Sequence, residues 1–144
     1  MTSKSDTLFL RLAEQIHSEE QVAVKAIECI EAFTERFNAR DLAGMDAMLH
    51  FPHAIVSGKE FKELIVWEQP GQMPASFFDD LIAATGWHRT TYRHKHVILA
   101  SAHKVHLLIE YSRDDAAGNV ITSHQNLWIV TFEDGRWGIK VRSH

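Results

Sequence analysis

The stretch FEDGRWGIKV, residues 132–141, contains the clearest turn signal in the chain. Asp134-Gly135 is a dipeptide preferred in two-residue type I′ turns, so it predicts a tight antiparallel hairpin. Cross-strand partners share a face, so the apolar pairs mark the buried face, and Lys140 and Arg142 are expected on the opposite one. The predicted pairs are Glu133–Arg136, Phe132–Trp137, Val130–Ile139, Trp128–Val141 and Asn126–Ser143.

Everything after Trp87 is predicted to be one antiparallel meander, with strands at about 88–101, 104–113, 119–133 and 136–143. Its alternation favours the register that buries Val105, Leu107 and Ile109, because a one-residue slip would bury Glu110 instead. The predicted pairs in the two earlier hairpins are Tyr111–Thr122, Ile109–His124, Leu107–Asn126, Val105–Trp128, Ala100–Val105, Ile98–Leu107, His96–Ile109 and His94–Tyr111.

The first half of the chain is predicted to be mainly helical. Asp6 caps a short helix, and a capping box at Ser18 opens a second helix with apolar positions from Val22 to Phe37. Asp41 caps a third helix, which Pro52 ends. The remaining elements are two short strands within 53–67 and a helix from Pro74 to Thr85 that stops at Gly86. We therefore predict one α+β domain, 1–144, in which 1–18 is a helical extension and 19–144 packs helices on about six strands.

The register predicts a cup with an apolar floor and a polar mouth at one end of the sheet. A small planar ligand would fit between His96 and His124, and Phe33 and Phe37 would floor the cup. His53 is expected near the mouth. The polar side chains expected to face inward are Tyr92, His94, His96, Tyr111, Thr122, His124, Asn126 and Ser143. The ligand-binding residues expected there are Tyr92, His94, Tyr111, Asn126, Trp128, Phe33, Phe37 and His53.

Two functions from different classes fit this cup. The first is a cofactor-independent lyase or isomerase in which His96 or His124 is the general acid–base, since an imidazole near pKa 6.5 serves both directions at neutral pH. The alternative is a non-catalytic, dimeric module that binds a small apolar or aromatic molecule. A metal site at His94, His96 and His124 is the weakest hypothesis, because no acidic residue clearly shares their face. We predict no metal ligand and no cofactor.

Composition narrows the partners. The net charge is −4, and no dense Lys/Arg stripe is present, which argues against nucleic acid. No apolar run approaches the roughly 18 residues of a membrane span. The single cysteine, Cys29, predicts a reducing cytoplasm. We also predict a homodimer through an apolar patch on the outer sheet face. Its residues are Val97, Leu99, Leu108, Leu127 and Ile129.

Three segments resemble the nuclear transport factor 2-like superfamily, which includes SnoaL-like cyclases, ketosteroid isomerase and scytalone dehydratase. They are the long helix running into FNARDLAGMDAMLHFPHAIVSG (37–58), the helix near Pro74, and the closing LWIVTFEDGRWGIKVRS (127–143). The resemblance implies a cystatin-like cone with a pocket between a curved sheet and the helices.

The resemblance does not extend to the isomerase's catalytic set. Phe33, Ser57 and Trp128 stand near the positions of its helix tyrosine, its base and its strand carboxylic acid. A dehydratase-like scheme with paired histidines and tyrosines fits better.

Overall fold

Helices precede a sheet in the computed structural model, which describes residues 4–58 and 64–144, with side chains from residue 20 onward. The elements are α1 (Lys4–Asn38), α2 (Leu42–Asp46), β1 (Leu49–Val56), β2 (Leu64–Trp67), α3 (Phe77–Thr85), β3 (Arg89–Ser101), β4 (Lys104–Asp114), β5 (Val120–Glu133) and β6 (Arg136–Ser143). The four predicted strands after Trp87 are confirmed to within one residue at each end. The second of the two short strands predicted within 53–67 corresponds to β2, and the part of that range from 59 to 63 lies outside the described residues.

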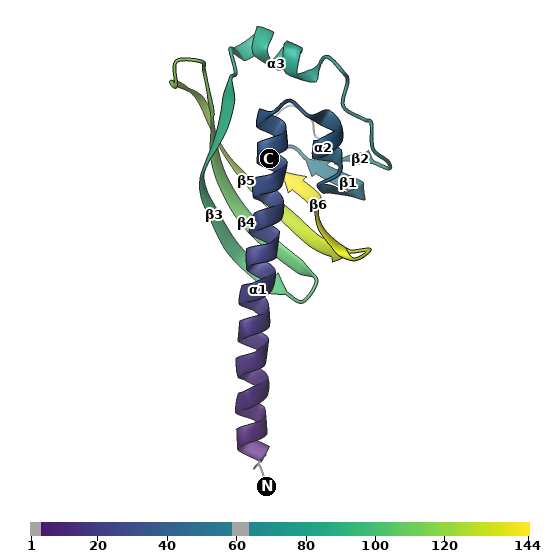
Figure 1. The fold of residues 1–144 in the computed structure, drawn as a ribbon, viewed down its shortest axis with the longest axis vertical. Coiled ribbons are helices and arrows are strands. Elements are labelled where there is room, and N and C mark those ends of the chain that lie inside the picture. The colour runs from purple at the N-terminus through teal and green to yellow at the C-terminus, as the bar shows by residue number, and fades with distance from the viewer. Residues whose placement is uncertain (1–3, 59–63) are drawn as a thin grey trace.

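The strands form one curved, open sheet in the order β2-β1-β6-β5-β4-β3. Strand β1 runs parallel to β6, and every other neighbouring pair is antiparallel. Helix α1 lies across the concave face, and α3 lies beyond one end of the sheet (Figure 1). The predicted α+β fold with a mixed six-stranded sheet is confirmed.

The predicted break between two N-terminal helices is wrong, because α1 runs without interruption from Lys4 to Asn38. This segment contains no glycine or proline, so nothing in its backbone chemistry ends a helix at Ser18. The capping box there is a local signal that continuous helix formation overrides. No helix among the described residues is long and apolar enough to cross a membrane.

The third helix is shorter than predicted. Asp41 caps α2 as expected, its Oδ1 accepting a hydrogen bond from the Gly44 amide at 2.9 Å. The helix ends at Asp46, however, and Pro52 lies inside β1 after a cis peptide bond. Helix α3 ends as predicted at Gly86, whose φ of 77° is the left-handed conformation that glycine adopts without strain.

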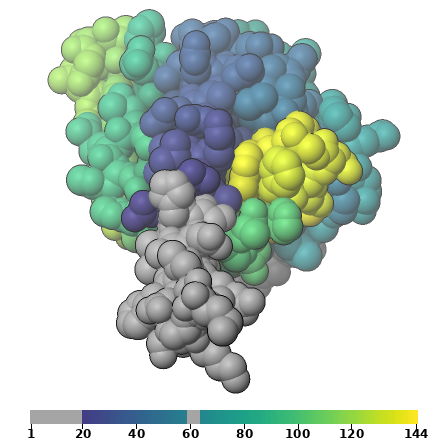
Figure 2. Space-filling model, turned by 60° about the horizontal axis from the view of Figure 1, so that its bottom comes forward, coloured from purple at the N-terminus to yellow at the C-terminus, as the bar shows by residue number. Residues whose placement is uncertain are grey.

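The core lies between α1 and the concave face of the sheet. Figure 2 shows α1 side chains (purple) between the β3–β4 side (green) and the end of the β5–β6 hairpin (yellow). Ile30 on α1 and Leu107 on β4 are fully buried, and each such side chain contributes about 1.5–3 kcal/mol by leaving water. Asn38 ties the end of α1 to β3, donating to the Thr90 carbonyl and accepting from the Thr90 amide.

Two β-bulges in β3 reverse the side-chain direction that the sequence predicted for His94 and His96. The ladder with β4 shifts between Tyr92 and His94, and again between Val97 and Leu99. A shift of one residue moves a side chain to the other face of a sheet. His94 and His96 therefore lie opposite Glu110 and Leu108 on the outer face, with 61% and 56% of their side chains exposed. The prediction that these histidines point into the cup is wrong.

The same bulges change the neighbours of the histidines. Lys95 pairs with Ile109 on the inner face, where the sequence placed His96 opposite Ile109, and forms an ion pair with Glu31 of α1. Val97 also has the inner phase, so it leaves the predicted outer patch, whereas Ile98 sits in the bulge and is 60% exposed rather than buried.

A third bulge redirects the end of β6. The pairs Glu133–Arg136, Phe132–Trp137 and Val130–Ile139 are confirmed, but the register then shifts, and Trp128 pairs with Arg142 rather than with Val141. Arg142 therefore lies on the concave face, opposite to the prediction. The final predicted pair is also wrong, since Ser143 pairs with Leu127 instead of Asn126.

Between β4 and β5, the register differs from the predicted one by two residues. Tyr111 pairs with His124, Ile109 with Asn126 and Leu107 with Trp128. A two-residue shift preserves which face each side chain occupies. The inward orientation of Asn126 and Trp128 is therefore correct although their partners are not.

Candidate functional site

A cavity of about 310 Å³ opens between the end of α1, the concave face of the sheet and the segment before α3. This volume is near the lower end of the roughly 300–1,000 Å³ that ligand pockets occupy. The lining residues used below are Phe33, Tyr92, Tyr111, Arg113, Trp128, Arg142 and His144.

Aromatic rings make up much of the cavity wall. Phe33 meets Trp128 edge to face, with ring centroids 5.6 Å apart. Tyr92 meets Trp128 at 6.1 Å and Tyr111 at 5.6 Å, both also edge to face. Phe37 lines the neighbouring wall. Such edge-to-face contacts stabilise the wall, and flat apolar walls of this kind suit an aromatic or alicyclic ligand.

Arg142 brings a largely buried positive charge to this apolar wall. Its guanidinium carbon lies 5.5 Å from the ring centroids of both Phe33 and Trp67, so the cation packs against two aromatic faces. Burial lowers the pKa of Arg142 to about 10, and nearby Tyr92, Tyr111 and, to a smaller extent, Asp46 act in the opposite direction. The group is still cationic at neutral pH.

Only one hydrogen bond holds the Arg142 guanidinium to the described part of the chain. Its Nε donates to Nε2 of His53 at 2.9 Å. No carboxylate among the described residues forms an ion pair with Arg142 or with Arg113, the second cation of the wall. The lining set contains no Asp or Glu among these residues. The cavity lining is therefore electropositive, and Asp46, the described carboxylate that acts on Arg142, lies outside the lining and forms no ion pair with it.

His53 lies behind Arg142, fully buried on β1. Its Nδ1 donates to the Ile139 carbonyl at 3.0 Å, which leaves Nε2 as the acceptor for Arg142. Burial, reinforced by the charge of Arg142, lowers the pKa of His53 to about 3. The imidazole is neutral at physiological pH, so it positions Arg142 and does not carry protons there.

A second polar group borders the cavity at Tyr111. Asn126 is buried, and its Nδ2 donates to Tyr111 Oη at 3.0 Å and lies 3.2 Å from His144 Nδ1. Because the Tyr111 oxygen accepts from Asn126, its own O–H proton remains for an acceptor in the cavity. Burial raises the pKa of Tyr92, so that phenol stays protonated.

The structure brings together some of the predicted site residues and separates others. Asn126 and His53 lie behind the cavity wall as supports for Tyr111 and Arg142. His124 stacks on Tyr111 at 4.9 Å but does not line the cavity, and His94 and His96 lie on the other face. The predicted ligand position between His96 and His124 is therefore wrong. The predicted residues that line the cavity are Phe33, Phe37, Tyr92, Tyr111 and Trp128.

Sequence reasoning missed the charged part of the site. Arg142 and Lys140 flank Val141, and alternation with Ile139 and Trp137 assigned both to the outer face. No residue type marks the bulge that turns Arg142 inward. The sequence analysis assigned no role to His144, yet it borders the cavity.

Comparisons with known proteins support the fold. No family model matches the chain, and no curated protein matches it in sequence. Among solved structures, a Nostoc punctiforme protein of unknown function with a cystatin-like fold matches with a TM-score of 0.65 and 12% identity, over 84% of this chain and 87% of that one. An NTF2-like protein of unknown function from Pseudomonas putida matches with a TM-score of 0.62 and 7% identity, over 89% and 85%.

A third solved structure contains a small molecule. It is a Mycobacterium tuberculosis protein in complex with estradiol-17beta-hemisuccinate, with a TM-score of 0.54 and 14% identity, over 83% of this chain and 91% of that one. Identities this low establish similarity of fold only.

Proposed function

The chain has the nuclear transport factor 2-like cone fold, and we propose that its cavity binds a small, largely aromatic or apolar molecule that carries one anionic group. The observation that carries this proposal is Arg142, a largely buried guanidinium with no carboxylate partner among the described residues. Arg113 adds a second positive charge to the same wall. Apolar surface with a few converging polar groups is the usual composition of a ligand site.

The energetics of the guanidinium support an anionic ligand. A pKa lowered from 12.5 to about 10 corresponds to a charging penalty of roughly 3 kcal/mol. A carboxylate or sulfonate would offset this penalty, because a guanidinium forms short, paired hydrogen bonds with such groups. The Tyr111 hydroxyl would donate to a second polar atom of the same ligand.

The estradiol-17beta-hemisuccinate complex supports a ligand-binding function, since a protein of similar fold holds a small organic molecule. The cavity of about 310 Å³ suits a ligand of about two fused rings.

The proposal is tested with a matched pair of probes, 2-naphthoate and 2-naphthamide, titrated into the untagged protein by calorimetry. We expect the acid to bind at least about 30-fold more tightly, because losing one partner of a buried charge pair costs about 2 kcal/mol or more. Arg142→Met should remove this preference. Arg89→Met is the matched control, since Arg89 is an exposed arginine at the start of β3. Equal affinity for the two probes in the wild type would reject the anionic group.

One observation favours the alternative, a lyase or isomerase. His144 and Tyr111 border the cavity and are linked through Asn126, so an imidazole and a phenol stand close enough to act on one substrate. His96 and His124 do not line the cavity, so the acid–base role predicted for them would pass to His144. Turnover of any bound compound by the wild type, and its loss in His144→Gln with binding retained, would support catalysis. Binding without turnover across the identified ligands would favour the binding module.

The homodimer and the cytoplasmic location predicted from the sequence stay proposals, and the structure changes which residues form the dimer patch. The outer patch now consists of Leu99, Leu108, Leu127 and Ile129, since Val97 has the inner phase. Leu99 is 52% exposed, which supports a partner surface there. Sedimentation of a monomer at micromolar concentration would remove the dimer. The lone Cys29 still supports the cytoplasm.

A further inference from the structure

The outer face of the sheet brings together three side chains that are ordinary metal ligands. His94 and His96 lie on β3, and Glu110 lies opposite on β4. Their ligand atoms all lie within 4.8 Å of one another. Nε2 of His94 is 3.9 Å from Oε2 of Glu110, and Nε2 of His96 is 4.0 Å from that same oxygen. We propose that these three side chains bind one divalent transition-metal ion of the zinc type.

The donor set selects the class of metal. Two imidazole nitrogens and one carboxylate suit Zn²⁺, Co²⁺, Ni²⁺ or Cu²⁺, whereas Mg²⁺ and Ca²⁺ require oxygen ligands. Two ligands about 2.0–2.1 Å from a tetrahedral ion lie about 3.3 Å from each other. The observed nitrogen-to-oxygen distances of 3.9 and 4.0 Å therefore have to close by about 0.6 Å. Both imidazoles are more than half exposed, so they are free to turn by this amount.

Two β-bulges in β3 bring these three side chains to the same face of the sheet. In an unbroken ladder, His94 and His96 would lie on the inner face, away from Glu110. The bulges on either side of residues 94–97 turn only this segment, so both imidazoles reach the outer face and stack 22° from parallel with centroids 5.3 Å apart. Bulges that re-aim side chains are common next to functional sites.

A neighbouring side chain holds the carboxylate in a suitable orientation. Gln125 on β5 donates through Nε2 to Oε1 of Glu110 at 2.7 Å. This bond occupies one carboxylate oxygen and leaves Oε2 facing the two histidines. Outer partners of this kind orient metal ligands and contribute to affinity.

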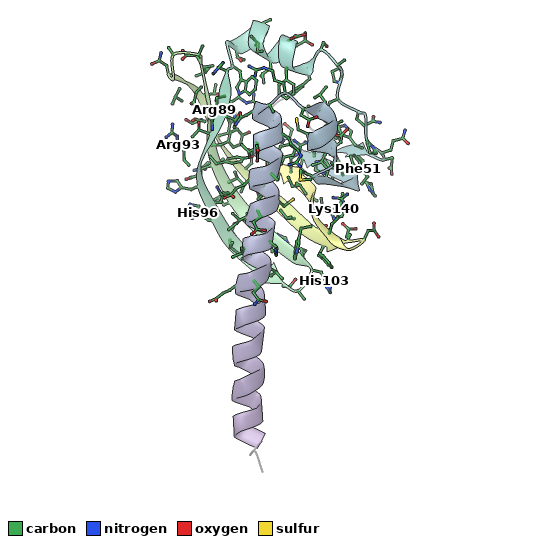
Figure 3. The ribbon with its side chains drawn as sticks, in the orientation of Figure 1. Phe51, Arg89, Arg93, His96, His103 and Lys140 are labelled. Carbon is green, nitrogen blue, oxygen red and sulfur yellow. The ribbon has the colours of Figure 1, made fainter. Side chains whose placement is uncertain are left out.

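No described residue around the three side chains supplies a fourth protein ligand. His124, which the sequence grouped with the two histidines, stacks on Tyr111, and its Nε2 is 2.8 Å from the Thr122 hydroxyl. Arg93 lines the same shallow hollow as His94 and Glu110, but its Nη2 donates to Ser112. Figure 3 shows His96 extending from β3 on the side away from α1. The fourth position of the ion is thus open to water.

Zinc chloride titrated by calorimetry into the untagged, metal-free chain tests the proposal. We expect one zinc ion per chain in the wild type, and at least about a 30-fold weaker affinity in the His94→Ala/His96→Ala double variant. Gln125→Leu should weaken binding about 10-fold. His88→Ala is the matched control, since His88 is an exposed histidine outside the cluster, and it should bind zinc as the wild type does.

Cobalt supplies a second readout that does not depend on affinity alone. The wild type with Co²⁺ should show the visible absorption of a tetrahedral ion, and the double variant should lose it while its circular dichroism stays unchanged. A wild type that binds no zinc at 1 mM would overturn the site. A double variant within about 3-fold of wild-type affinity would also overturn it.

Discussion

Replacing Arg142 with methionine separates a functional charge from a structural one. Methionine has a similar length and no charge, so it keeps contact with Phe33 and Trp67 while removing the guanidinium. Two effects on stability oppose each other. Removing the buried charge relieves roughly 3 kcal/mol, estimated from a pKa lowered from 12.5 to about 10. Leaving Nε2 of His53 without its donor costs about 1–3 kcal/mol.

The net expectation is an unfolding free energy between about 0 and 2 kcal/mol above that of the wild type, without ligand. Urea denaturation followed by tryptophan fluorescence measures it. The same variant should lose at least about 30-fold in affinity for 2-naphthoate and less than about 3-fold for 2-naphthamide. A protein that gives up binding while keeping or gaining stability shows that the charge is retained for its ligand.

Two results would refute this reasoning. A destabilisation of more than about 2 kcal/mol would show that the Arg142 charge stabilises the fold and is not kept unpaired for a ligand. Unchanged affinity for 2-naphthoate, with Arg89→Met as the control, would place the anionic group elsewhere. The expected change in unfolding free energy includes the loss of the single hydrogen bond from Arg142 to His53. The variant His53→Gln, in the same background, measures that contribution separately.

Three other predictions concern burial and backbone phase. His53 has a pKa of about 3 in the fold and about 6.5 in the unfolded chain, so between these pH values it takes up a proton only on unfolding. The free energy of unfolding of the wild type should therefore fall by up to about 1.4 kcal/mol for each pH unit below about 6.5. Urea titrations of His53→Gln should lack that contribution. Ile98→Ala should change the unfolding free energy by less than about 0.5 kcal/mol and Leu107→Ala should lower it by about 2–5 kcal/mol, whereas similar losses would contradict the bulge at Ile98. The thiol of Cys29, buried with a pKa raised to about 11, should react with a disulfide reagent at pH 8 only in urea, and rapid reaction of the folded chain would contradict its burial.

The sequence predicted the fold well because its turn chemistry and apolar alternation agree. Asp134 and Gly135 have φ values of 52° and 76°, as the type I′ turn requires, and the three strand pairs nearest the turn follow from it. The β4–β5 loop is less specific, so its register is off by two residues. Since a two-residue shift keeps each face, the inward direction of Tyr111 and Trp128 is still right.

The candidate site was less predictable because bulges leave little trace in a sequence. Val97, Ile98 and Leu99 are all apolar, so either alternation of faces along β3 satisfies the hydrophobic pattern. The alternation chosen without a bulge assigns the preceding histidines to the wrong face of the sheet. In β6, Ile139 and Val141 alternate as in a regular strand, which hides the shift that brings Arg142 inside. Both errors are one-residue shifts of strand register, and no residue type in these strands predicts such a shift.

The most direct test of the proposed function is a crystal structure of the protein grown with 2-naphthoate. We predict the naphthalene ring in the cavity, against Phe33 and Trp128, and the carboxylate about 2.7–2.9 Å from the Arg142 guanidinium nitrogens. Naphthoate bound with its carboxylate away from Arg142, or a cavity that stays empty at saturating probe, would contradict it.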